Sequence, residues 1–165
     1  MKAAVLREVG KPLTIEDVKI NKPGPHEVLI RTVAAGVCHS DLHFVEGSYP
    51  YPLPAVLGHE SAGVVEQVGS EVRTVKPGDH VITCLSAFCG HCEHCLTGHL
   101  SRCVSPETKR EADEEPRLGG TAGAMNQFLN RSSFGEQMLM HEHACVAIRK
   151  DMPLDRAALF GYSVT

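Results

Sequence analysis

The most informative stretch of this chain reads Phe88-Cys89-Gly90-His91-Cys92-Glu93-His94-Cys95, and a fourth cysteine follows at Cys103. Two residues separate Cys89 from Cys92 and Cys92 from Cys95, so a short loop can bring four sulfur atoms around one ion. Four thiolates about 2.3 Å from the metal form a closed structural zinc site. Four buried free thiols are the alternative, but charged and polar residues between the cysteines do not suit a packed core. We therefore expect a zinc lobe over residues 84–104 that folds a loop and does no chemistry.

Composition favours a single mainly β domain around this lobe. The chain has 165 residues with 15 Gly, 10 Pro and only 5% aromatic residues, which suits many turns and short strands. The net charge of −4 provides no positive field for nucleic acid or an anionic membrane, so a small molecule is the expected partner. The apolar run at the N-terminus is too short for a membrane span, and an odd number of cysteines, 7, suits a reducing compartment. We expect a cytoplasmic protein.

Alternating apolar and polar residues predict six strands, separated by turn segments such as Lys22-Pro23-Gly24-Pro25. The pattern predicts a β barrel with few helices, in which the charged run 107–117 is a solvated loop. From Asp151 the composition predicts a turn and the start of a helix that includes Ala157 and Phe160. The predicted strands are Lys2–Glu8, Leu13–Val18, Val28–Ala34, Gly63–Val68, His80–Thr83 and Ala144–Ile148.

A second candidate metal site lies outside the lobe, at Cys38 and His59. These residues are far apart in sequence, so only the fold can bring both to one ion. Asp41 could accept a hydrogen bond from the far nitrogen of His59 and fix its orientation. Ser40 and His43 could carry a proton, although Ser40 could also cap a helix. A zinc ion with one open position would act there as a Lewis acid.

Several motifs occur in the order found in one enzyme family. The central motif, Gly58-His59-Glu60-Ser61-Ala62-Gly63 followed by Gly69 and Val72, resembles the signature of zinc-containing alcohol dehydrogenases. The other matching segments are Met1–Val5, Gly36–Asp41, Gly78–Val81 and the four-cysteine lobe. Over essentially its whole length, the chain resembles the N-terminal, GroES-like catalytic domain of medium-chain zinc-dependent alcohol dehydrogenases. The resemblance implies a domain over residues 1–150, with residues 151–165 leading toward a nucleotide-binding domain.

The resemblance also assigns roles to single residues. Glu60 matches a carboxylate able to approach the metal, and Ser40 matches the hydroxyl that takes the alcohol proton. His43 matches the imidazole that passes this proton on toward solvent, and His39 matches a basic residue beside the cofactor pyrophosphate. The positions of the metal ligands match Cys38 and His59 for a catalytic zinc and Cys89, Cys92, Cys95 and Cys103 for a structural zinc.

Two features depart from the family pattern. The third catalytic ligand of the family is a cysteine, and Tyr162 stands at that place, which makes Tyr162 a doubtful ligand and Glu60 a second substitute. The glycines of Leu118–Gly123 lack the Gly-x-Gly-x-x-Gly spacing and a βαβ frame, so they do not predict a dinucleotide site. We therefore expect a part of a longer enzyme, with the Rossmann domain absent from this chain.

Two functions from different classes follow from these observations. The first is the catalytic domain of an enzyme that interconverts alcohols and aldehydes or ketones with NAD or NADP, with little turnover as an isolated chain. The second is a zinc-binding β domain or assembly fragment without catalysis, which Tyr162 favours. Exposed apolar residues near Phe160 and Tyr162 would promote self-association, so we expect oligomers.

Overall fold

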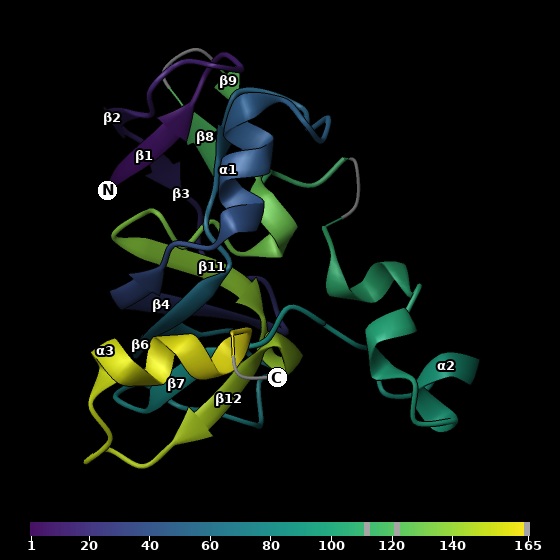
Figure 1. The fold of residues 1–165 in the computed structure, drawn as a ribbon. Coiled ribbons are helices and arrows are strands. Elements are labelled where there is room, and N and C mark those ends of the chain that lie inside the picture. The colour runs from purple at the N-terminus through teal and green to yellow at the C-terminus, as the bar shows by residue number, and fades with distance from the viewer. Residues whose placement is uncertain (111–112, 121–122, 164–165) are drawn as a thin grey trace.

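The computed structural model describes residues 1–110, 113–120 and 123–163. Its central element is a five-stranded antiparallel sheet with the strand order β11-β4-β6-β7-β12 (Figure 1). The sheet curls into an open half-barrel, because its two long strands change register twice along their pairing. The strands of this sheet are β4 (Glu27–Gly36), β6 (Glu60–Val68), β7 (His80–Thr83), β11 (Gln137–His141) and β12 (Cys145–Ile148).

Two smaller sheets complete the β structure. A four-stranded sheet has the order β10-β5-β1-β2, and its strands are β1 (Lys2–Leu6), β2 (Thr14–Asp17), β5 (Ala55–Val56) and β10 (Asn126–Gln127). A three-stranded sheet has the order β3-β8-β9, and its strands are β3 (Lys19–Ile20), β8 (Leu118–Gly120) and β9 (Gly123–Ala124). The mainly β fold expected from composition is therefore confirmed.

The helices are short. The α-helices are α1 (His39–Glu46), α2 (Glu93–Leu96) and α3 (Leu154–Ala157). The 3₁₀ segments are η1 (Leu100–Arg102), η2 (Pro106–Thr108), η3 (Phe128–Asn130), η4 (Glu142–Ala144) and η5 (Ala158–Gly161). Among the described residues, none of these helices has the length and apolar character needed to cross a membrane.

The main core lies against the five-stranded sheet. Val28, Ile30 and Val81 are fully buried there, together with Met138 and Met140 of β11. Branched side chains fill such a surface well, since they pack closely on a pleated sheet. The consecutive elements α3 and η5 pack back onto β4 and β6, where Ala157 and Ala158 are buried against Ala62 (Figure 1). This return of the chain brings residues 161–163 close to the start of β6.

Most sequence-predicted strands are present with shifted ends, and the helical start after Asp151 is present as α3 and η5. Two expectations were wrong. The run 107–117 is only partly a solvated loop, because Arg110 and Arg117 turn inward and bind the buried carboxylate of Glu27. Ser40 does not cap α1, since the N-cap is Cys38. Residues 111, 112, 121 and 122, which belong to the predicted loop and to Leu118–Gly123, lie outside the described residues.

Candidate metal centre and active site

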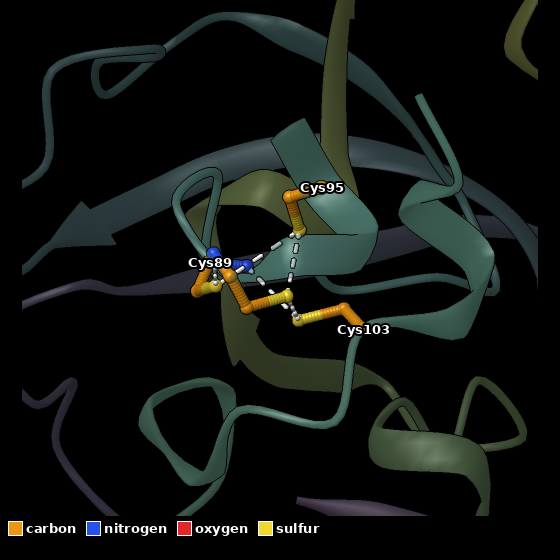
Figure 2. A group of neighbouring side chains, drawn as sticks. Cys89, Cys95 and Cys103 are labelled. Atoms are coloured by element: carbon orange, nitrogen blue, oxygen red, sulfur yellow. Dashed lines mark hydrogen bonds between the residues drawn. The ribbon is translucent and has the colours of Figure 1, made fainter. Parts of the chain in front are cut away.

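The zinc lobe stands beside the sheets, with α2 and η1 projecting from the body of the molecule (Figure 1). Its four cysteine sulfur atoms lie within 4.8 Å of one another, and the labelled side chains converge in Figure 2. The distance from Cys92 Sγ is 3.5 Å to Cys95 Sγ and 3.9 Å to Cys103 Sγ. A tetrahedron with zinc–sulfur bonds of 2.3 Å has edges of about 3.8 Å. The lobe therefore has the dimensions of a structural zinc site.

Backbone groups support the same geometry. Cys92 N donates to Cys89 Sγ over 3.3 Å, and Cys89 N donates to Cys103 Sγ over 3.3 Å. N–H donors of this kind stabilise thiolates and hold them in the orientation needed for a metal. Hydrogen bonds from the backbone of His91, the largest cause, and of Cys92 lower the pKa of Cys89 to about 6 against the opposing effect of burial.

The second site begins at Cys38, which lies between the end of β4 and the start of α1. Ser40 N donates to Cys38 Sγ over 3.5 Å, while Cys38 N donates to Asp41 Oδ2 over 3.2 Å. This reciprocal arrangement is a capping box, and it fixes the Cys38 side chain at the helix N-terminus. Burial raises the pKa of Cys38, but hydrogen bonds from Ser40 and the nearby His59 outweigh this effect and lower the pKa below the usual thiol value.

Asp41 connects this helix to His59, which lies just before β6. Its Oδ1 atom accepts hydrogen bonds from His59 Nδ1 and Gly58 N, both over 3.2 Å. Both the Asp41 and His59 side chains are almost fully buried. Burial lowers the pKa of His59, but the Asp41 carboxylate raises it more, so the net pKa is above the usual value. Since Asp41 occupies Nδ1, Nε2 is the ring nitrogen left to face a metal.

The fold brings together the two residues that the sequence separates. One ligand atom each from Cys38, His59 and Glu60 lies within 4.8 Å of the others. A thiolate, an imidazole and a carboxylate are three of the groups that bind zinc in proteins. The donor set therefore fits a zinc ion with a position left for another ligand.

Tyr162 lies beside this group of side chains. Its ring centroid is 4.8 Å from that of His59, and the two rings are nearly perpendicular. Gly161 precedes it and lies so close to Thr83 that a side chain at position 161 would collide with the Thr83 carbonyl oxygen. This close approach brings Tyr162, the doubtful ligand suggested by the sequence, against His59.

The residues expected to carry a proton lie on α1, next to the metal-binding atoms. Ser40 Oγ is 3.5 Å from Cys38 Sγ. The His43 ring contacts His39 and Tyr49 edge to face, with centroid separations of 4.7 and 5.2 Å. His43 Nδ1 is buried and has no hydrogen-bond partner within the described part of the chain. His39 is exposed.

Sequence analysis missed the aromatic residues that surround the site. Phe128 is fully buried, and its ring lies 4.7 Å from Phe44, 5.1 Å from Tyr51 and 5.9 Å from His59. Tyr51 Oη donates to Gln127 O over 3.0 Å, which anchors the ring. These aromatic residues come from distant segments, so no local pattern marks them as neighbours. They make one side of the site apolar.

With this geometry in hand, the chain can be placed among known proteins. Residues 24–150 match the alcohol dehydrogenase GroES-like domain, and the chain belongs to this family. It is similar to geraniol dehydrogenase of Castellaniella defragrans, with 42% identity over 98% of this chain and 44% of that protein.

Solved structures have the same fold. An alcohol dehydrogenase zinc-binding domain protein from Burkholderia ambifaria superposes with a TM-score of 0.87 at 41% identity, over 97% of this chain and 45% of that one. Benzyl alcohol dehydrogenase from Acinetobacter calcoaceticus gives a TM-score of 0.85 at 34% identity, over 97% of this chain and 44% of that one. The chain spans less than half the length of these relatives.

Proposed function

We propose that this chain forms the metal- and substrate-binding part of a zinc-dependent alcohol dehydrogenase that oxidises an alcohol to an aldehyde or ketone with NAD or NADP. The convergence of Cys38, His59 and Glu60 beside an apolar wall carries this proposal. Zinc held there would supply Lewis acidity that lowers the pKa of an alcohol. Family membership and the dehydrogenase names of similar proteins support the reaction class.

The residues of the chain have separate tasks in this proposal. Asp41 holds His59 in the tautomer with Nε2 facing the metal. The Ser40 hydroxyl, next to Cys38 Sγ, accepts the proton of the substrate alcohol and hands it to His43. The free Nδ1 of His43 leaves that ring a site for hydrogen bonding.

The aromatic side chains suggest the kind of substrate. Phe44, Tyr51 and Phe128 present rings rather than charged groups near His59, which favours an alcohol with an apolar or unsaturated chain. Two similar proteins are named for geraniol and benzyl alcohol, both of which are such alcohols. We propose this substrate class, with the nucleotide bound by a domain outside the chain and His39 near its pyrophosphate. The seven free cysteines support a reducing, cytoplasmic location.

The test joins this chain to the part of the Acinetobacter benzyl alcohol dehydrogenase that lies outside the match, to which the proposal assigns nucleotide binding. The match covers 97% of this chain and 44% of that one. The chimera should oxidise benzyl alcohol or geraniol with reduction of the nicotinamide, and Cys38→Ser should abolish turnover. A matched Cys84→Ser variant, altered at a cysteine outside both sites, should remain active. A folded chimera that binds cofactor and two zinc ions without turnover would favour the non-catalytic zinc-binding domain.

Metal analysis gives an independent test on the chain itself. Four thiolates bind zinc more tightly than a mixed set with one open position, so mild chelation should remove one of two zinc ions first. Loss of the metal from Cys38 should leave the lobe zinc in place. Two zinc ions released together at the same chelator concentration would contradict this assignment.

A further inference from the structure

The Glu60 carboxylate has unusual surroundings for an ionisable group. Its residue is only 2% exposed, and no ion pair involving Glu60 is found in the described ranges of the chain. Burial of a carboxylate is costly unless a cation or several hydrogen bonds compensate for it. The carboxylate points toward Cys38 and His59, where a divalent ion would provide the missing positive charge.

The two oxygen atoms of this carboxylate have different neighbours. Ser163 Oγ donates a hydrogen bond to Glu60 Oε1 over 2.7 Å, from a segment more than 100 residues away in sequence. The other oxygen, Oε2, packs against Gly36, which pairs with Glu60 across strands β4 and β6. A side chain at position 36 would collide with Oε2 and would lie only 3.0 Å from Glu60 Cβ. Gly36 therefore leaves space for the observed orientation.

The segment that carries Ser163 is fixed independently of the metal. Ala157 and Ala158 are buried under the sheet against Ala62, so η5 cannot move freely away from β6. Two successive residues after η5 then contact the site. The Tyr162 ring packs against His59, and the Ser163 hydroxyl binds Glu60.

Building on the proposed metal centre, we infer that Ser163 and Gly36 are positioning residues that present Glu60 as the third protein ligand. One oxygen of the carboxylate accepts from Ser163, while the carboxylate as a whole is held toward Cys38 and His59. This role differs from that of a catalytic residue, because Ser163 acts on the site only through the hydrogen bond that it donates to Glu60. It also explains how the site could be completed with tyrosine at position 162.

Cobalt(II) binding to the chain tests this inference, with zinc already in the four-cysteine lobe. Charge transfer from the Cys38 thiolate to cobalt gives the second site an absorption band. The band that is lost in Cys38→Ser therefore belongs to this site. Ser163→Ala should weaken cobalt binding about tenfold, as loss of an outer partner of a metal ligand typically does. Glu60→Gln should weaken it further. Ser70→Ala, an exposed serine at the opposite end of β6, is the matched control and should bind cobalt like the unmodified chain.

The outcomes separate the two proposals. If the unmodified chain, with zinc in the lobe, shows no cobalt signal that Cys38→Ser removes, the proposed catalytic metal centre is wrong. If it binds cobalt there and Ser163→Ala binds that ion equally tightly, the positioning role alone is wrong. Loss of affinity in Tyr162→Phe but not in Glu60→Gln would assign the third place to the phenol oxygen and would also overturn the inference.

A second variant guards against a folding failure. Gly36→Ala should displace Glu60 and weaken cobalt binding without touching the segment after η5. Retention of lobe zinc and of the native circular dichroism spectrum shows that each variant is folded. Folded Gly36→Ala and Ser163→Ala variants that both retain full affinity would refute the positioning role.

Discussion

The hydrogen bonds of Asp41 make a quantitative prediction about how the site is assembled. This carboxylate accepts from Cys38 N, Gly58 N and His59 Nδ1, each over 3.2 Å. Asp41→Ala removes both acceptor oxygens and with them all three hydrogen bonds, and two of the donors, Gly58 and His59, are buried. At about 2 kcal/mol for each buried donor left without a partner, the variant loses about 4 kcal/mol. Loss of the helix cap adds about 1 kcal/mol.

Asp41→Asn separates charge from shape. The amide keeps an oxygen acceptor but loses the negative charge. If the NH₂ group takes the place of Oδ2, it faces the Cys38 N–H, which is also a donor. We expect this variant to lose about 2 kcal/mol, less than half of the loss in Asp41→Ala. Asp17→Ala is the control, because Asp17 forms an exposed ion pair with Lys2 that contributes about 0–1 kcal/mol.

Urea unfolding followed by far-ultraviolet circular dichroism measures these differences, since the chain has no tryptophan. The measurement is made with the lobe zinc bound and the second site empty, so that metal affinity does not enter the free energy of unfolding. A loss of less than about 1 kcal/mol in Asp41→Ala would refute the reasoning, because buried donors would then have found other partners. Equal losses in the alanine and asparagine variants would show that the neutral amide oxygen cannot replace the carboxylate, so that the charge accounts for the whole effect.

Three further predictions concern other parts of the molecule. Burial raises the pKa of Glu27, but Arg110 and Arg117 lower it to about 2, so its stabilisation is complete above the usual value of 4.5 and is lost as pH falls toward 2. The contribution of Glu27 to the free energy of unfolding is about 3 kcal/mol. Urea unfolding at several pH values should show that Glu27→Gln removes this pH dependence, and the same dependence of the unfolding free energy on pH in both proteins would contradict the prediction. Phe128→Ala should cost about 3–5 kcal/mol, with a smaller loss in Phe128→Leu, and equal unfolding midpoints for the two would contradict this. Cys92→Ser should lower the zinc content by one ion per chain in metal analysis, while unchanged zinc content would refute the lobe assignment.

The sequence predicted what local spacing can encode. The cysteine lobe was predictable because its ligands lie within one short segment, and its sulfur atoms do converge in the structure. The main strands were predictable from alternating residues, because a half-buried sheet imposes a period of two. The ends of the strands were less predictable. For example, β4 begins at Glu27, a buried charged residue that the alternation of apolar and polar residues does not mark as part of a strand.

The contacts that complete the second site could not be predicted in this way. Ser163 reaches Glu60 only because α3 and η5 pack on β6. Likewise, the side chain of Arg117 turns inward from its charged loop and forms an ion pair with Glu27, because the buried carboxylate needs a cation. Such contacts depend on long-range packing, for which neither composition nor periodicity carries a signal. The family resemblance supplied the expected neighbours of His59, but it assigned no role to Ser163 or Gly36.

Helix α1 shows that the site and the fold depend on the same groups. The helix has only eight residues, a length at which an isolated helix is unstable in water. Its N-terminus is stabilised by the reciprocal bonds of Cys38 and Asp41, and its C-terminus ends at Gly47 in a left-handed conformation. The same cap orients the thiol of Cys38, while Asp41 orients His59, which lies just before β6. Formation of the helix therefore brings two of the proposed ligands into place, and a substitution that frays its first turn should weaken metal binding even when both ligands remain.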